Sequence, residues 1–359
     1  MIYMDYAATS PMTEKALAAY MEVAQRYYGN SASLHDVGGQ AHYFVEQSRK
    51  VVANALGIHR DGIIFTGSGT EGNILAILSL ALASTKGKHI ISSQAEHTSV
   101  HAALNTLEEM GFIVTKLPLQ KDGCIDLQQL QQAIREDTAL ITIQHINSEI
   151  GVIQPVEEII EIAKASHIFC HIDCVQSFRK QVLPTGADAL TISAHKIGGP
   201  KGCGAVYINP VIRVPALAPG VTHERGLRGG TIDTPAIVAF ATAIEDYQYD
   251  WQHYKALRKF FTSNLPKNCQ LIECHQQLPS ICGVMMEKVE GQYVLLKLNE
   301  AGICISTGSA CDIHSESGTK AILSMGYTSE VARQFFRISF GPSTTFEEIE
   351  TLQKALVAI

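Results

Sequence analysis

Short apolar runs alternate with amphipathic segments through the first two thirds of the chain. An apolar run of about four to eight residues is typical of a buried strand, and apolar positions three or four apart are typical of a helix. This pattern predicts strands at residues 63–66, 89–93, 113–117, 140–145, 168–173, 189–192 and 204–208. Helices are expected at residues 74–82, 127–134, 156–165 and 235–244, with another that ends at residue 110. This alternation predicts an α/β fold with a mainly parallel sheet and helices on both faces.

The two ends of the chain have other patterns. Residues 1–11 resemble a short strand that runs into a loop, Thr13 is a candidate N-cap, and His35 is interpreted as a capping or solvent-facing residue before a helix at 39–56. From about residue 246, the pattern predicts strands at 270–274, 281–287, 303–307 and 336–340 and helices at 250–265, 291–300, 320–325 and 345–356. We therefore expect a large domain, 12–248, and a smaller α+β domain formed by 1–11 and 249–359.

Composition narrows the class of protein. A chain of 359 residues exceeds the usual size of a single core. A net charge of −7 gives no reason to expect nucleic-acid binding. No apolar run is long enough for a membrane span and the first residues do not resemble a signal peptide, so we expect no membrane association and a cytoplasmic location. The nine cysteines are an odd number without dense spacing, which predicts free thiols.

A glycine turn follows the first predicted strand of the sheet. Gly67, Gly69 and Gly72 precede a helix, and a strand, a glycine turn and a helix N-terminus together can hold an anion. Residues 89–93 do not end in the acidic residue of a dinucleotide site, and the lysine of a P-loop is absent. The turn is therefore a candidate phosphate site, although many such turns bind nothing.

Polar residues follow several other predicted strands. His97 and the segment that begins at Asn147 lie where α/β proteins keep their ligands. An imidazole at that edge can stack on a flat cofactor and move protons, although a histidine near a helix start often only caps it. Asp173 at a strand end suits the pyridinium nitrogen of pyridoxal phosphate (PLP), and Gln176 suits its ring hydroxyl.

The cysteines near Asp173 raise the question of a metal. Cys170 and Cys174 occur within five residues together with His171 and Asp173. Because side chains alternate along a strand, the cysteines share one face, and His171 and Asp173 share the other. The cysteines are therefore interpreted as core residues, and no metal site is expected.

Lys196 has a hydroxyl and an imidazole just before it and glycines after it. A lysine amine in a dry site loses its proton easily and forms a Schiff base. If the segment is extended, Ser193 and His195 point the same way and can reach one phosphate. A lysine beside phosphate ligands is what PLP requires, and the alternative is a surface lysine in a glycine-rich loop.

Two later segments add candidate chemistry. Residues 220–231 hold arginines between glycines and end at Thr231, which suggests either an anion site or a solvated basic loop. Cys311 lies among small and polar residues in 308–318, and we expect this loop to be exposed and mobile. Its thiol is either reactive, if His314 lowers its pKa against the opposing charges of Asp312 and Glu316, or an incidental surface cysteine. Arg337, on a predicted strand, can hold a carboxylate through two parallel hydrogen bonds.

In order and spacing these motifs resemble the cysteine desulfurases of the NifS/IscS type, within the class-V aminotransferase family of PLP enzymes. The resemblance runs nearly end to end, through motifs at residues 5–9, 29–35, 69–71, 95–97, 147–151, 171–176, 193–196, 223–226, 308–311 and 337–339. It implies the PLP-dependent transferase fold of type I and a homodimer. Two departures, Ser148 and Gly229, remove none of the roles below.

The resemblance also implies a role for each candidate residue. The lysine that binds PLP covalently would be Lys196, and the catalytic nucleophile would be Cys311. The cofactor would be held by Gly69, Thr70, His97, Asp173, Gln176, Ser193, His195 and, from the other subunit, Thr231. His97 would also handle protons, and the carboxylate of L-cysteine would be held by Asn147 and Arg337.

By the same resemblance, L-cysteine would become L-alanine and its sulfur would be held as a persulfide on Cys311. The persulfide would pass to an acceptor protein, either an iron–sulfur scaffold or another acceptor. Residues 312–317 differ from the Thr/Ser-rich housekeeping version, which points to a specialised member, for instance one that serves NAD or other cofactor biosynthesis. The alternatives are a selenocysteine lyase, a cysteine-sulfinate desulfinase and, more remotely, a non-catalytic scaffold in sulfur trafficking.

Overall fold

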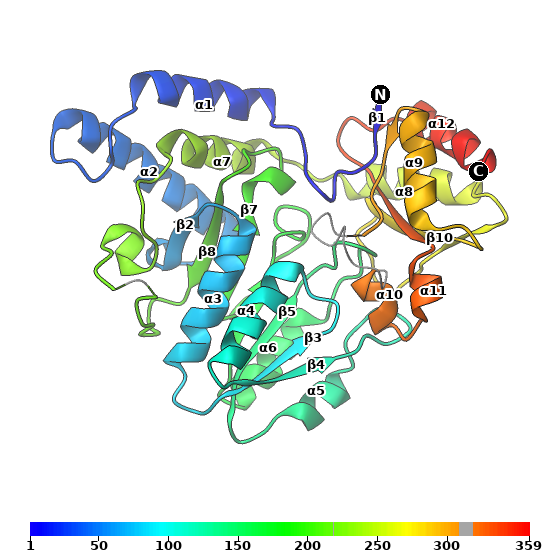
Figure 1. The fold of residues 1–359 in the computed structure, drawn as a ribbon. Coiled ribbons are helices and arrows are strands. Elements are labelled where there is room, and N and C mark those ends of the chain that lie inside the picture. Colours follow the sequence, from blue (N-terminus) through cyan, green and yellow to red (C-terminus); the bar gives the residue numbers. More distant parts are fainter. Residues whose placement is uncertain (218, 309–318) are drawn as a thin grey trace.

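A seven-stranded sheet forms the centre of the larger part of the fold in the computed structural model, which describes residues 1–217, 219–308 and 319–359 (Figure 1). In spatial order the strands are β2 (Ile63–Thr66), β8 (Gly204–Ile208), β7 (Ala189–Ser193), β6 (Phe169–Asp173), β5 (Thr138–Gln144), β3 (His89–Ser93) and β4 (Ile113–Leu117). Of these seven strands, β8 runs opposite to the other six. The predicted α/β fold and its mainly parallel sheet are confirmed.

Helices cover both faces of this sheet (Figure 1). They are α1 (Glu14–Arg26), α2 (Asp36–Leu56), α3 (Gly69–Ala83), α4 (Thr98–Glu109), α5 (Leu127–Ala133), α6 (Val156–Ala165) and α7 (Thr234–Asp246). On one face Leu80 of α3 and Leu104 of α4 pack on the strands, and on the other face Ile160 of α6 and Phe240 of α7 do so. Because both faces are buried, the strands are apolar throughout, which explains why continuous apolar runs located them.

The C-terminal part has a smaller antiparallel sheet. Its strands are β9 (Cys269–Leu271), β10 (Ile281–Met286) and β12 (Phe335–Ser339), with β10 in the centre. Its helices are α8 (Trp251–Ser263), α9 (Gly291–Glu300), α10 (Lys320–Ser324), α11 (Ser329–Ala332) and α12 (Phe346–Val357). A separate core cluster, which includes Met4, Leu257 and Phe336, fills this part.

The N-terminus lies with the C-terminal part of the chain (Figure 1). Strand β1 (Ile2–Tyr3) pairs in parallel with β11 (Ile303–Cys304), and Asp5 bridges to Ser339. Residues 5–10 then cross toward the central sheet, where Ser10 N–H donates to the carbonyl of His195 at 2.9 Å. The crossing segment therefore contacts both sheets. The domain boundaries at 11/12 and 248/249 stay a prediction.

Several helix ends follow from side-chain caps. Thr13 caps α1, as predicted. His35 Nδ1 accepts the N–H of Gly38 at 3.1 Å, so the capping interpretation of His35 is confirmed and α2 begins at Asp36, three residues before the predicted start. Gly57 ends α2 with φ 66°, a left-handed conformation that favours glycine.

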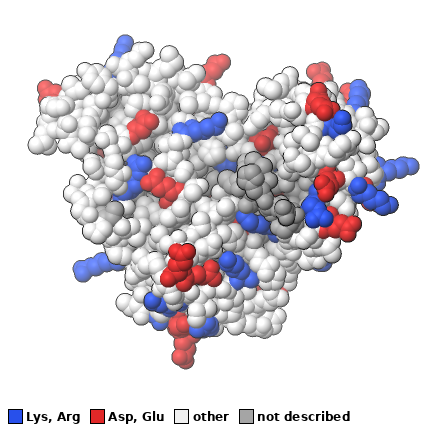
Figure 2. All heavy atoms as spheres, in the orientation of Figure 1, with Lys and Arg blue, Asp and Glu red and all other residues white. Residues whose placement is uncertain are grey.

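Acidic and basic side chains are interspersed on the face shown in Figure 2, without a continuous basic area. Among the described residues, no helix is both long and apolar enough to cross a membrane.

Candidate active site

The carboxyl ends of the central strands surround a cavity of about 270 Å³, here called the strand-end cavity. Its lining includes nine residues predicted from the sequence, which are Gly69, Thr70, His97, Asp173, Gln176, Ser193, His195, Lys196 and Arg337. The first and the last of them in the sequence, Gly69 and Arg337, are 268 positions apart. The structure therefore brings most of the candidate chemistry to one edge of the sheet, as expected for an open α/β sheet.

Lys196 lies at the end of a one-turn 3-10 helix, η2 (Ala194–Lys196), that directly follows β7. Its Nζ donates to the carbonyl oxygens of Ala7 and Ala8 at 2.6 and 2.9 Å. Burial, with smaller contributions from the positive charges of Arg337 and Lys180, lowers the pKa of Lys196 to about 7. A large fraction of this amine is thus neutral near neutral pH, the form needed for Schiff-base chemistry.

The geometry around Ser193 and His195 differs from the expected extended segment. Ser193 ends β7, and the chain then turns into η2, so the two side chains do not belong to one strand face. The cause is tertiary, since Ser10 Oγ of the crossing segment donates to the carbonyl of His195 and accepts the N–H of Gly198, just after the turn. Both side chains still line the strand-end cavity. Burial, followed by the charge of Lys196, lowers the pKa of His195 to about 3, so its imidazole is neutral.

The glycine turn packs closely against the end of the sheet. Ser68 caps α3 by accepting the N–H of Glu71, and a Cβ on Gly69 would lie 2.8 Å from Val175 Cγ2. The buried Ser193 Oγ has no hydrogen-bond partner among the described residues. A phosphate oxygen at the N-terminus of α3 would satisfy that hydroxyl, so the residues fit the phosphate of PLP.

Asp173 is held by two hydrogen bonds at the end of β6. Its Oδ1 accepts the N–H of Val175 at 2.9 Å, and its Oδ2 accepts from Asn73 Nδ2 at 2.7 Å. Asn73 also donates to Ser99 Oγ at 2.9 Å, and that oxygen lies 2.7 Å from His97 Nδ1. A chain of contacts therefore joins Asp173 to His97 across the cavity.

Two further contacts define the neighbourhood of these groups. His97 Nδ1 accepts the backbone N–H of Ser99 at 3.2 Å, so a neutral His97 carries its proton on Nε2. Gln176 Nε2 donates to the carbonyl of Ala7 at 2.7 Å. Sequence reasoning missed Asn73 and Ser99. For Asn73, the available signal was a polar side chain near the start of the largely apolar helix α3.

Arg337 and Asn147 lie together at the opposite side of the site. Arg337 on β12 is 1% exposed, and its Nη atoms donate to the carbonyl of Ser148 at 2.8 Å and to Asp5 Oδ1 at 2.7 Å. Asn147 Oδ1 accepts the N–H groups of Glu149 and Ile150, each at 2.9 Å. Asn147 therefore shapes its own loop and does not line the strand-end cavity, whereas Ser148 does.

Comparisons with known proteins now decide the family. The family model "Aminotransferase class-V" matches residues 2–352. A putative cysteine desulfurase NifS of Bacillus subtilis (strain 168) is 41% identical over 98% of this chain and 93% of its own. The cysteine desulfurase of Mus musculus is 35% identical over 99% and 80%. This chain belongs to the cysteine desulfurase branch of the class-V aminotransferases.

Solved structures agree with this family. A NifS-like protein superposes with a TM-score of 0.91 at 30% identity and covers 99% of this chain and 98% of its own. A structure described as SspA in complex with cysteine gives a TM-score of 0.86 at 32% identity over 96% of this chain and all of its own. The resemblance and the fold family inferred from the sequence motifs are thus confirmed.

Two further residues that the desulfurase resemblance singles out are Thr231 and Cys311. Thr231 is exposed and does not line the strand-end cavity. Cys311, with the predicted loop 308–318 apart from Gly308, lies outside the described residues.

Glu149 lies beside both residues that flank the segment containing Cys311. Glu149 Oε2 accepts the N–H of Ala321 at 2.8 Å and the hydroxyl of Thr319. A Cβ on Gly308 would lie 3.8 Å from Glu149 Oε1. Gly308 and Thr319 therefore lie beside Glu149, which directly follows Ser148 of the cavity lining. Sequence reasoning did not assign a role to Glu149.

The residues considered as metal ligands, His171, Cys170 and Cys174, are buried in β6 or directly after it. Both ring nitrogens of His171 face threonine hydroxyls of the neighbouring strands, Thr142 at 2.8 Å and Thr191 at 3.0 Å. Burial raises the pKa of the Cys170 and Cys174 thiols, as for small core residues. The interpretation of these cysteines as core residues is confirmed. Among the described residues, no group of three His, Cys, Asp or Glu side chains is placed to hold a metal.

Proposed function

We propose that this protein is a PLP-dependent cysteine desulfurase. The observation that carries the proposal is the buried Lys196 amine, whose pKa is lowered to about 7. It faces a cavity that also contains Asp173 and the Ser193 hydroxyl, which no described residue hydrogen-bonds. The names of the relatives, and the cysteine in the complex of the structural relative SspA, support L-cysteine as the substrate.

In this proposal the cavity residues hold PLP from several sides. Gly69, Thr70, Ser193 and His195 bind its phosphate, Asp173 pairs with its ring nitrogen, and Gln176 faces its ring hydroxyl, while His97 stacks on the ring. When bound, PLP supplies an electron sink for the loss of the substrate's Cα proton. Because Asn73 and Val175 both donate to Asp173, its carboxylate is oriented before any ligand arrives.

The chain's own groups then move protons and hold the substrate. The Lys196 amine accepts the Cα proton, since its lowered pKa favours the neutral base near neutral pH. His97, with its proton on Nε2, donates toward the cavity. Arg337, fixed by Asp5 and Ser148, holds the substrate carboxylate, and Asn147 orders the loop that carries Ser148.

Cys311 is the nucleophile in this proposal. Its thiolate attacks the sulfur of L-cysteine, the bond between that sulfur and the substrate's Cβ breaks, and a persulfide remains on Cys311. The electron pair of the broken bond stays on the carbon skeleton, which takes up a proton at Cβ, regains a proton at Cα from Lys196 and leaves as L-alanine. An acceptor protein receives the terminal sulfur, either an iron–sulfur scaffold or another acceptor that serves NAD or other cofactor biosynthesis. We expect the enzyme to act in the cytoplasm as a homodimer.

The deciding experiment measures alanine and sulfide release from L-cysteine by the purified protein with dithiothreitol. We expect equal amounts of both products from the parent and neither from Cys311→Ala, with the visible absorbance of bound PLP unchanged. Cys304→Ala is the matched control, because Cys304 is a half-buried thiol seven positions earlier and should leave both products intact. A parent that binds PLP but releases neither product contradicts the proposal. Parallel assays with selenocysteine and cysteine sulfinate separate the lyase and desulfinase alternatives.

A further inference from the structure

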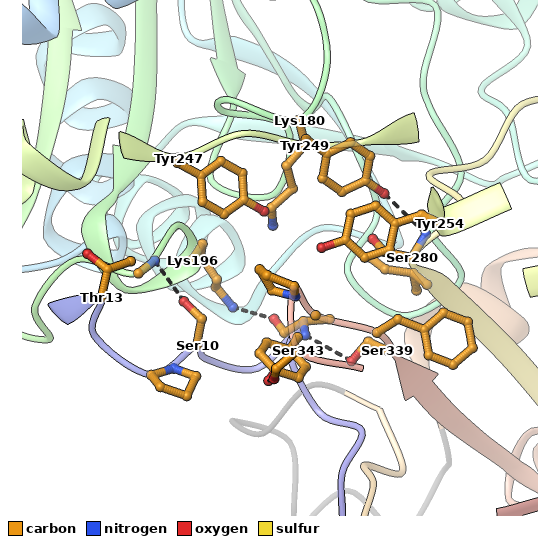
Figure 3. Close-up of a pocket in the computed structure, with 18 of the residues that line it drawn as sticks. Ser10, Thr13, Lys180, Lys196, Tyr247, Tyr249, Tyr254, Ser280, Ser339 and Ser343 are labelled. Carbon is orange, nitrogen blue, oxygen red and sulfur yellow. Dashed lines mark hydrogen bonds between the residues drawn. The ribbon is translucent and has the colours of Figure 1, made fainter. Parts of the chain in front are cut away.

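A second cavity adjoins the strand-end cavity and shares Ala7, Gln176 and Lys196 with it (Figure 3). Its volume is about 280 Å³, close to the lower end of the roughly 300–1,000 Å³ typical of small-molecule sites. We call it the tyrosine cavity, because Tyr247, Tyr249 and Tyr254 line it. None of the roles assigned above uses this space.

Lys180 is a buried ammonium group in the wall of the tyrosine cavity. The residue is 7% exposed, and its Nζ donates to Gln176 Oε1 at 3.4 Å. Burial lowers the pKa of Lys180 to about 8, and Lys180 forms no ion pair among the described residues. The carboxylate that lines this cavity, Glu14, is exposed at the start of α1. The Lys180 amine is still mainly protonated at neutral pH. A buried cation without a counterion is costly, and an anion in the cavity would remove that cost.

The chain holds Lys180 at this place through contacts from both parts of the fold. Arg179, just before it, has a left-handed φ of 61°, an uncommon conformation for a residue with a side chain. Arg179 Nη2 donates to the carbonyl of Tyr247 at 3.1 Å, and Trp251 Nε1 donates to the carbonyl of Lys180 at 2.9 Å. Strained residues that are held in this way often serve a site.

The remaining walls suit an apolar body. Tyr249 stacks on Tyr254 with ring centroids 4.4 Å apart, and Ile281 and Phe340 add aliphatic and aromatic surface. In Figure 3, Lys180 extends past Tyr249 toward the middle of the cavity. Burial raises the pKa of the three tyrosines, so their hydroxyls stay protonated and can donate to oxygen atoms of a ligand.

We propose that the tyrosine cavity binds a small carboxylate with an aromatic or aliphatic body and that Lys180 is its counterion. This site is distinct from the place of the substrate carboxylate at Arg337, which does not line the tyrosine cavity. It does not depend on the desulfurase activity proposed above, because binding can be measured without turnover.

The site is coupled electrostatically to Lys196. The charge of Lys180 is one of the causes that lower the pKa of Lys196, after burial and Arg337. A carboxylate beside Lys180 offsets that charge, so its binding raises the proton affinity of the Lys196 nitrogen. A ligand in the tyrosine cavity would therefore regulate the protonation of the group that carries PLP.

Calorimetric titration of the PLP-loaded protein with benzoate tests the proposal, with benzamide as the neutral ligand of the same shape. We expect benzoate to bind and benzamide to bind roughly 10- to 100-fold more weakly, as for the loss of a charge-assisted hydrogen bond. Lys180→Met should weaken benzoate to the level of benzamide, and Lys180→Arg should retain binding. Thermal unfolding of each variant verifies that it folds.

Arg337→Lys separates the two cavities. Benzoate binding that survives this variant and is lost in Lys180→Met supports the proposed site. Binding lost in Arg337→Lys but retained in Lys180→Met places the anion at the substrate site and overturns the proposal. Equal affinity for benzoate and benzamide, or no binding of either, also overturns it. The coupling predicts that benzoate raises the pH midpoint of the visible PLP band in the parent and not in Lys180→Met.

Discussion

The side-chain amide of Asn73 makes two hydrogen bonds, one to the carboxylate of Asp173 and one to the hydroxyl of Ser99, which contacts His97. Replacing Asn73 with Ala leaves the Asp173 oxygen without this donor in a buried place. We expect PLP to bind roughly 10- to 100-fold more weakly, as for a lost hydrogen bond to a charged group. Titration of the PLP-free protein with PLP, followed by its visible absorbance, measures this.

Ser79→Ala is the matched control for Asn73. Ser79 is a buried polar residue on the same helix, and its Oγ has no hydrogen-bond partner among the described residues. Its loss should leave PLP affinity unchanged. Equal affinities for Asn73→Ala and the parent would show that Asp173 needs no support from α3.

The lowered pKa of Lys196 gives the PLP-free protein a pH-dependent stability. The folded protein releases this proton near pH 7, whereas the unfolded chain holds it up to about pH 10.5. The unfolded state therefore binds more protons between these values, and the free energy of unfolding rises with pH across that range. In urea denaturation at pH 7 and pH 9, Lys196→Met should show a smaller increase in the free energy of unfolding than the parent. The increase that remains comes from Lys180, whose pKa is also lowered. An equally steep rise in the variant would contradict the lowered pKa.

At the scale of elements, the sequence pattern located the strands of the central sheet well and the strand at residues 303–307 poorly. All seven predicted strands of the central sheet exist, because both of its faces are covered and its strands are apolar throughout. The predicted strand 303–307 is only Ile303–Cys304, which pairs with β1, and beyond it Ser306 forms a single bridge to Arg337. Local pattern cannot show how far a partner strand extends.

At the scale of the whole molecule, the site depends on contacts that no local motif contains. The predicted strand ends placed Asp173, Lys196 and His97 at the site correctly, because the carboxyl ends of parallel strands meet at one edge of the sheet. The carbonyls that accept from Lys196 come from Ala7 and Ala8, 189 and 188 positions away. Nothing around Lys180 indicated a cavity, because its walls come from the N-terminal crossing, α7–α8 and the end of β12.

The loop that carries Thr231 is anchored on its own protomer, while Thr231 itself is exposed and away from the strand-end cavity. Glu224, near the start of the loop, accepts from Arg49 at 2.8 and 2.9 Å and from the N–H of Phe65 at 2.6 Å. From this arrangement we predict that Thr231 binds phosphate in the partner subunit's cavity. If so, each active site combines Lys196 of one subunit with Thr231 of the other.

Subunit mixing tests this prediction. Lys196→Ala and Thr231→Asp should each be inactive, the first without its amine and the second through repulsion of the phosphate. If Thr231 acts across the dimer, a mixed dimer of the two variants has one site with both defects and one intact site, so co-expression restores sulfide release. If Thr231 acts within its own subunit, every site in the mixed dimer has one defect and no activity returns. The two variants carry different tags, and purification on both tags in sequence isolates the mixed dimer. A mixed dimer of the parent chain and Lys196→Ala is the control, because it gives the activity expected of one intact site.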